Sequence, residues 1–346
     1  MSRDLVLSVY RPPRARTPWR LEALLGLPCA RHYSLGRWAL AEALRLAGAG
    51  PGRPVLWPGY ICREVLAAGA AAGAPPLYYA LDASLRPAAD PADWPAAAAV
   101  VAVDYFGFPQ DLAPFEAFCR RTGAVLIEDA AHALLGREPA GRWLGARAPL
   151  GVFSPRKTLP IPDGGTLAVL DPALAARVQA QAPARARGRG KRALLRAAAP
   201  WLGPRTTLRA LALARSVRRG MSGSELPPPD PDGERRIAVG PEPCAELAAP
   251  IVSLDHAADA ARRKALYAVC ARLLAPAGVA PVFGSMPEGT VPYLYPFRAS
   301  GAQAEAAERL LRREGLASLP WPDLPEAVAP AAPSHYRDVR GVHFLW

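Results

Sequence analysis

The chain has 346 residues, of which 51% are apolar and 21% charged, a balance that predicts a soluble globular protein of about two domains. Its first twenty residues contain no long apolar core, so we expect neither a secretory signal nor a membrane span, and a cytoplasmic location. The formal net charge is +12, and the five scattered cysteines lack a CxxC spacing, which disfavours a disulfide framework or a bound metal.

Segments with helix and strand patterns alternate through the first half of the chain. Strands are expected at 53–60, 76–82, 98–107, 124–128, 150–154 and 164–171, and helices at 34–50, 62–73 and 111–121. Ser34 is expected to cap the first of these helices, Asp111 to cap the third, and Gly123 to end it. Short apolar strands that alternate with helices predict an α/β fold, in which a mostly parallel sheet is flanked by helices.

The excess of positive charge lies in one basic tract, 172–224, which contains twelve Arg or Lys and no acid. Its apolar residues have near-helical spacing, and Pro200 and Pro204 divide it into two expected helical pieces. The tract could contact a phosphate-rich substrate, nucleic acid or an anionic lipid surface, or its arginines could simply be solvated. Because it has neither interleaved aromatic residues nor a known nucleic-acid motif, direct reading of DNA or RNA is disfavoured.

The C-terminal part follows a Pro-rich linker at 226–233. Helix patterns at 258–274 and 302–315 alternate there with strand patterns at 291–299 and 342–346. We therefore predict a large domain at 1–240, which includes the basic tract, and a small C-terminal α/β domain at 241–346.

Lys157 is unusual because the chain contains only three lysines against 39 arginines. A lysine just after a strand suggests a site that needs an amine, which can lose its proton and act as a nucleophile. Asp129 and Ser154 also follow or end apolar strands, and ligands of parallel sheets bind at the carboxyl ends of strands.

Pyridoxal 5'-phosphate chemistry requires such a pair of residues: a lysine that forms a Schiff base and an aspartate that keeps the pyridine nitrogen protonated. The phosphate needs backbone amides at a helix N-terminus, which Gly36 and Arg37 could supply. Taken alone, Asp129 or Lys157 would equally fit a structural ion pair or a cap.

Three segments together resemble the DegT/DnrJ/EryC1/StrS family of pyridoxal-phosphate aminotransferases: VDYFGFPQDL at 103–112, VLIEDAAHALLG at 125–136 and GVFSPRKTLPIPDGG at 151–165. The similarity extends over about 30–345 and is strong at 101–170. It implies a PLP-dependent transferase of fold type I with a small C-terminal domain. Members of this family usually act on keto-sugars linked to nucleotides and have their sites at the interface of a homodimer.

By position, the resemblance assigns Lys157 as the Schiff-base lysine and proton shuttle, and Asp129 as the partner of the ring nitrogen. His132 would lie near the ring or its phenolic oxygen. The other implied cofactor residues are Ser154, Gly36 and Arg37 for the phosphate, and Tyr60, or Cys62 close to the aligned position, for stacking on the ring.

The chain departs from the family pattern in three places. The loop between Phe153 and Lys157 is two residues shorter than is common, and Gly36-Arg37 stands where most members have Gly-Thr. No Gly-x-Asn-x-Arg motif follows the lysine. The last difference weakens the inference to a nucleotide-sugar substrate more than the inference to cofactor binding.

The sequence therefore predicts a homodimeric aminotransferase that uses pyridoxal 5'-phosphate to move an amino group, from glutamate by analogy with the family, to a keto or aldehyde acceptor such as a sugar. Lysine at 157 argues against relatives that remove hydroxyl groups, which have histidine there. Two alternatives remain. One is a non-catalytic protein of this fold whose arginine-rich surface binds nucleic acid, anionic lipid or a partner, and the other is a pyridoxal-phosphate enzyme of another reaction type.

Overall fold

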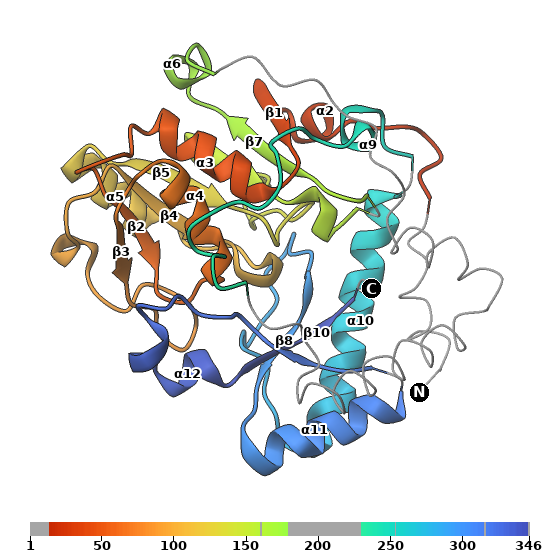
Figure 1. Cartoon of the computed structure of the whole chain (residues 1–346). Coiled ribbons are helices and arrows are strands. Elements are labelled where there is room, and N and C mark those ends of the chain that lie inside the picture. The colour runs from red at the N-terminus through yellow and green to blue at the C-terminus, as the bar shows by residue number, and fades with distance from the viewer. Residues whose placement is uncertain (1–13, 160, 179–229, 253, 315, 345–346) are drawn as a thin grey trace.

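The computed structural model describes residues 14–344 except 160, 179–229, 253 and 315. Two β-sheets organise this part of the chain, a large one from the first half and a small one near the C-terminus (Figure 1). The predicted helices of the basic tract fall almost wholly outside the described residues. None of the described helices is long and apolar enough to cross a membrane.

The large sheet has seven strands in the order β1-β7-β6-β5-β4-β2-β3. Their bounds are β1 Cys29–Tyr33, β2 Val55–Pro58, β3 Pro76–Tyr79, β4 Ala99–Val103, β5 Val125–Asp129, β6 Leu150–Phe153 and β7 Gly165–Val169. Strands β2 to β6 are mutually parallel, whereas β7 runs antiparallel to both of its neighbours. The predicted mostly parallel sheet is confirmed, and the carboxyl ends of β2, β4, β5 and β6 share one edge.

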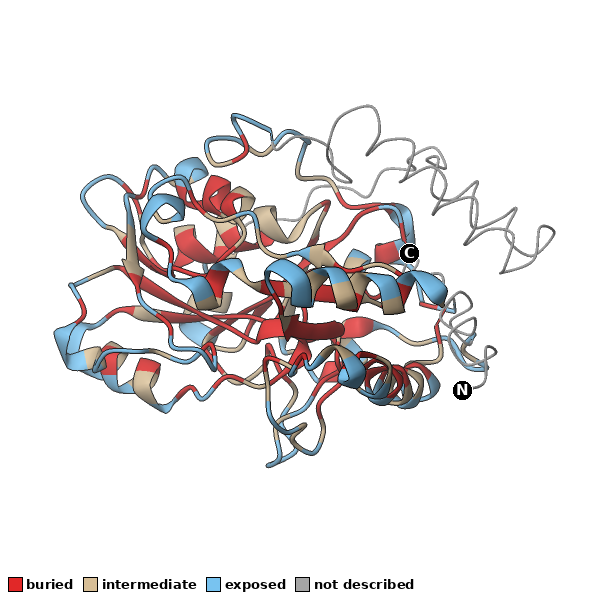
Figure 2. Ribbon diagram, turned by 90° about the horizontal axis from the view of Figure 1, so that it is seen from below, coloured by how far each residue is buried: buried red, intermediate tan, exposed pale blue. Residues whose placement is uncertain are grey.

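Nine α-helices surround the sheets: α2 Leu21–Leu25, α3 Gly36–Leu46, α4 Ala67–Ala71, α5 Ala113–Thr122, α6 Pro172–Ala175, α9 Ala245–Ala248, α10 His256–Leu274, α11 Gly301–Arg313 and α12 Ser334–Arg337, counted over the described residues. In β7, Leu167 and Val169 pack in the core cluster that contains α3, while Ala168 packs with α2 and α9. The sheet is therefore covered on both faces, and its inner strands are buried, whereas the edge strands β1 and β3 are partly exposed (Figure 2).

Local sequence signals explain both ends of α5. The Asp111 carboxylate accepts a hydrogen bond from the Ala113 N–H at the start of α5, and Gly123 ends that helix with a φ of 75°. Ser34 does not cap α3, whose N-cap is Leu35; instead the Ser34 hydroxyl donates to the carbonyl of Gly240. This correction has a long-range cause, because the segment before α9 crosses the start of α3.

The small sheet contains β8 Leu294–Arg298, β9 Leu319–Pro320 and β10 Val339–His343 in the antiparallel order β8-β10-β9. All three strands fall within 241–346. The same range also contributes α9, which packs on α2 beside the large sheet, and Ile251, which forms a β-bridge with Trp19. That 241–346 folds as a separate domain thus stays a prediction.

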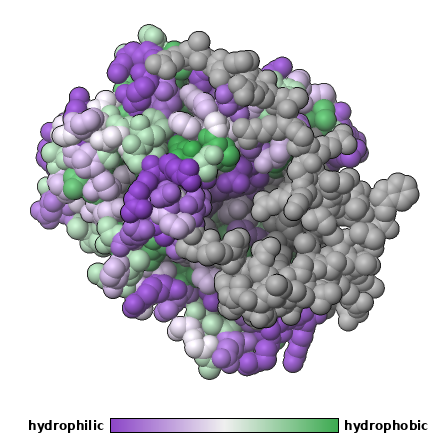
Figure 3. Space-filling model, in the orientation of Figure 1, coloured by the Kyte–Doolittle hydropathy of each residue, from purple (hydrophilic) through white to green (hydrophobic). Residues whose placement is uncertain are grey.

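The described residues on the face of the molecule shown in Figure 3 are mainly hydrophilic, with small hydrophobic patches between them.

Candidate active site

Lys157 lies one helical turn beyond the carboxyl end of β6, in the 3₁₀ helix Pro155–Lys157 that begins after Ser154. Its side chain is half-buried. Burial lowers the pKa of the amine to about 8, although the nearby Asp129 carboxylate acts in the opposite direction. A substantial fraction of this amine is therefore neutral near pH 8, which is the state a nucleophile or base requires.

Asp129 is the last residue of β5 and is buried. Its Oδ1 accepts a hydrogen bond of 2.9 Å from the Ala131 N–H, and its carbonyl accepts one of 3.0 Å from the Asp104 N–H. Burial raises the pKa of its carboxyl group, while Lys157 and the Ala131 N–H act to lower it. Within the described residues Oδ2 has no hydrogen-bond partner, which leaves this oxygen for a ligand.

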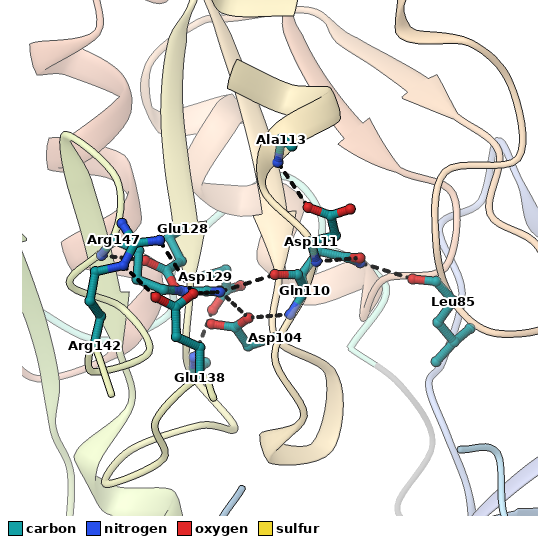
Figure 4. A network of polar contacts seen from close by, with 11 residues as sticks. Leu85, Asp104, Gln110, Asp111, Ala113, Glu128, Asp129, Glu138, Arg142 and Arg147 are labelled. Carbon is teal, nitrogen blue, oxygen red and sulfur yellow. Dashed lines mark hydrogen bonds and ion pairs between the residues drawn. The ribbon is translucent and has the colours of Figure 1, made fainter. Parts of the chain in front are cut away.

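A buried ion-pair network supports the end of β5 from behind (Figure 4). The Arg147 guanidinium lies 2.7 Å from Asp104 Oδ1, 2.6 Å from Glu128 Oε1 and 3.3 Å from Glu138 Oε2. Arg147 also donates to the Gln110 carbonyl at 3.0 Å. Burial and the Glu128 carboxylate raise the pKa of Asp104 well above its usual value, with Arg147 opposing them. Sequence reasoning missed this network, although acids at the ends of two apolar strands are the signal that a buried cation must accompany them.

His132 is 6% exposed and follows β5 by three residues. Its ring is stacked against Tyr293 at 4.7 Å between centroids, and its Nδ1 is buried without a hydrogen-bond partner among the residues that the structure describes. Burial, with Lys157 and His343 adding smaller effects, holds the pKa of the imidazole well below its usual range. A neutral imidazole beside Lys157 is the result.

The start of α3 packs against the end of β6. A Cβ placed on Gly36 would lie 3.5 Å from the Ser154 Cβ, so the first turn of α3 lies against this serine. A Cβ on Gly165 would lie 2.1 Å from the Leu35 carbonyl oxygen, so only glycine there permits this approach. The amides of Gly36 and Arg37, at the first two helix positions, are among those an α-helix leaves without an internal acceptor. They and the Ser154 hydroxyl suit an anion.

The side chains of two predicted cofactor residues, Arg37 and Tyr60, are engaged in contacts within the protein. The Arg37 guanidinium pairs with Glu64 at 3.2 Å, so its side chain is already engaged. Tyr60 is fully buried and its hydroxyl donates to the Trp321 carbonyl at 2.6 Å, which leaves no ring face for a cofactor. The alternative, Cys62, is partly exposed and lies within electrostatic range of Lys157, which lowers the thiol pKa against the dominant effect of burial.

The structure thus brings Lys157, Asp129, His132 and Cys62 together at one edge of the large sheet, with the anion-binding groups of α3 and Ser154 beside them. An amine, a carboxylate with a free oxygen and an unpaired imidazole nitrogen fit the groups of pyridoxal phosphate that need partners. A cavity of about 280 Å³ lies elsewhere, with Ser84, Gln110 and Pro287 in its lining, and none of the predicted site residues line it.

Comparisons with known proteins agree with this fold. The Saccharopolyspora erythraea erythromycin biosynthesis sensory transduction protein EryC1 is 34% identical over 151 residues, which are 41% of this chain and 40% of that protein. The dTDP-3-amino-3,4,6-trideoxy-alpha-D-glucose transaminase of Streptomyces venezuelae is 34% identical over 152 residues, 42% of this chain and 40% of that protein. The matched region thus spans well under half of these relatives.

Solved structures match over more of the chain. A DegT DnrJ EryC1 StrS aminotransferase from Brucella abortus has a TM-score of 0.61 at 20% identity, over 94% of this chain and 83% of that one. The structure of 3-amino-5-hydroxybenzoic acid synthase gives 0.61 at 22% identity with the same shares, 94% and 83%. These likenesses establish the fold. The model of the DegT/DnrJ/EryC1/StrS aminotransferase family matches residues 20–201, more than half of the chain, and the chain therefore belongs to that family.

Proposed function

We propose that this protein is a pyridoxal-phosphate-dependent aminotransferase. The observation that carries the proposal is that Lys157, whose amine has a pKa of about 8, lies within electrostatic range of the buried Asp129 carboxylate. The family to which the chain belongs is one of aminotransferases. A purely structural ion pair would bring the two groups into a hydrogen bond, whereas no such bond is found between them among the described residues.

The phosphate of the cofactor would be held by the Gly36 and Arg37 amides at the positive end of α3 and by the Ser154 hydroxyl. Asp129 Oδ2 would accept a hydrogen bond from the protonated ring nitrogen, and His132 Nδ1 would contact the phenolic oxygen. When bound, pyridoxal phosphate would supply an electron sink for the charge left as an amine substrate loses a proton.

Lys157 would carry that proton. Its neutral amine would accept the proton at Nζ and the resulting ammonium would release it again, and a pKa near 8 allows both directions near neutral pH. The Asp129 carboxylate would stabilise positive charge at the ring and at the protonated amine. Burial of Asp129 keeps bulk water from screening its carboxylate.

Glutamate is the proposed amino donor and a keto or aldehyde group of a sugar-like molecule the proposed acceptor. A similar protein, the L-glutamine:2-deoxy-scyllo-inosose aminotransferase of Streptomyces kanamyceticus, is 33% identical over 152 residues, 42% of this chain and 35% of that protein. Its name supports a sugar-like acceptor and a donor related to glutamate. A homodimer and a cytoplasmic location complete the proposal.

The first experiment is to record the visible absorption of the purified protein with added pyridoxal phosphate, beside a Lys157→Ala variant. We expect a band of lysine-bound cofactor in the wild type and none in the variant. A wild type that binds no cofactor would overturn the proposal. Where the band forms, analysis of products from candidate amines separates transamination from another reaction type, such as elimination.

A further inference from the structure

The imidazole of His132 lies in a stack of three nearly parallel rings. The Tyr293 ring is 4.7 Å away with 7° between the planes, and the Phe106 ring is 5.8 Å away with 8° between the planes. Trp321 meets the imidazole edge-on at 5.0 Å. These neighbours fix the plane of the imidazole and keep it from solvent.

The stack joins the two sheets. Phe106 follows β4 of the large sheet, and Tyr293 directly precedes β8 of the small one. The Tyr293 N–H donates a 2.8 Å hydrogen bond to the Phe106 carbonyl. Next to it, Gly107 has a φ of 93°, and a Cβ there would lie 2.2 Å from the Val291 carbonyl oxygen. Glycine at 107 thus permits the two backbone segments to cross closely, and this crossing brings Tyr293 to the ring stack.

A second residue of the small sheet completes the surroundings of His132. His343 pairs in register with Leu294 across β10 and β8, and its ring meets the Tyr293 ring edge-on at 5.4 Å. The titratable groups that act on the His132 imidazole are Lys157 from the large sheet and His343 from the small one, and both lower its pKa in addition to burial. The small sheet therefore contributes to both the packing and the charge of this imidazole.

We propose that Tyr293 and His343 are positioning residues of the Lys157 centre, which hold the imidazole of His132 in one plane with its Nδ1 available to a ligand bound at Lys157. This inference rests on the proposed function. A neutral imidazole has one donor and one acceptor nitrogen, so it can bond a ligand oxygen without placing a second positive charge beside Lys157. The C-terminal sheet would thus take part in the chemistry without touching the reacting atoms.

The test is to follow the histidine ring signals of the full-length protein by NMR against pH, without added cofactor. The chain contains only five histidines, so single His variants assign each signal. We expect His132 in the wild type to titrate well below 6.5, and Tyr293→Leu, which removes the stacked ring, to raise its pKa by about one unit. His343→Gln should raise it by less, and Tyr293→Phe, which keeps the ring, should leave it unchanged.

Tyr295→Leu is the matched control, because Tyr295 lies two residues further on in β8 and its ring contacts within the described chain are Tyr267 and Phe297. It should cost stability but leave the His132 titration as in the wild type. In turnover assays Tyr293→Leu should lower kcat roughly 100-fold with a smaller change in KM, and Tyr293→Phe should restore kcat.

The proposal is overturned if His132 titrates near 6.5 in the wild type, or if Tyr293→Leu and His343→Gln both leave its titration unchanged. Because these readings need no cofactor, they are separate from the test of the proposed function. A wild type that shows the shifted His132 titration but no absorption band with pyridoxal phosphate overturns the proposed function, and with it the role of these residues in a reaction.

Discussion

Two adjacent residues of β5, Glu128 and Asp129, are both buried acids, but their surroundings differ. The Glu128 carboxylate receives two bonds from Arg147, one from its side chain and one from its backbone N–H. Asp129 receives one bond, from a backbone N–H, and lies near a lysine with a lowered pKa. Glu128, with both oxygens hydrogen-bonded, belongs to the network that supports the sheet, and Asp129, with one oxygen left over, belongs to the candidate site. Burial alone does not mark a candidate catalytic acid, but burial together with an unpaired oxygen and a nearby amine of lowered pKa does.

The largest effect on stability is expected when the support network loses its cation. Arg147→Met leaves Asp104 and Glu128 buried without a positive partner and should lower the free energy of unfolding by about 3–5 kcal/mol, measured by urea denaturation. Arg142→Met is the control, because the Arg142 side chain is 59% exposed where it pairs with Glu138. That change should cost about 0–1 kcal/mol. Equal losses in the two variants would contradict the distinction.

The proposed role of Asp129 in the site is tested by Asp129→Asn, which keeps the shape of the side chain but removes its charge. It should lower kcat by about 10²–10³-fold, measured with saturating donor and acceptor, and change the unfolding free energy little. Glu128→Gln makes the same change one residue earlier and should do the reverse, with lower stability and nearly unaltered kcat. Similar losses of kcat in both would show that Asp129 has no special role.

The lowered pKa of Lys157 predicts how cofactor capture depends on pH. Because burial lowers the pKa from 10.5 to about 8, the neutral amine is reached at lower pH than for an ordinary lysine. The rate of band formation with pyridoxal phosphate should rise about tenfold per pH unit below 8 and level off above it. Asp129→Asn removes an influence that raises this pKa, so its midpoint should move to lower pH. A rate that still rises beyond pH 10 would count against the assignment.

The smallest effect is expected at the phosphate end of the site. Ser154→Ala removes one hydroxyl beside the start of α3 and should weaken pyridoxal phosphate binding roughly 10- to 100-fold, the range for one hydrogen bond to a charged group, as measured by equilibrium titration. Ser300→Ala, at the start of the distant α11, should bind like the wild type. No difference between the two would place the phosphate elsewhere.

The sequence predicted the six apolar strands of the large sheet and the main helices, because their burial patterns and glycine stops are local. It missed β1, whose residues CARHY contain two basic side chains and pair with β7 only through the fold. Lys157 and Asp129 could be found because their strands are regular and end at the same edge of the sheet.

What the sequence did not show depends on contacts between distant segments. Tyr60 is the nearest aromatic candidate for stacking on the ring, but packing against Trp321 from the far end of the chain turns it into the core. Tyr293 contacts His132, and His343 contacts Tyr293, because the loop after β4 crosses the segment that precedes β8. The sequence around His132 therefore does not predict its contacts with the C-terminal part of the chain.

The most direct test of the central claim is a single-turnover assay for the keto acid that the amino donor leaves, which is 2-oxoglutarate from glutamate and 2-oxoglutaramate from glutamine. The protein, loaded with pyridoxal phosphate, is mixed with glutamate or glutamine without an acceptor, and the keto acid formed is quantified beside the absorption band. We predict about one equivalent of keto acid per protein as the band fades, and none with Lys157→Ala. A band that forms in the wild type but stays unchanged, with no keto acid from either donor, would contradict the assignment of this site to amino-group transfer.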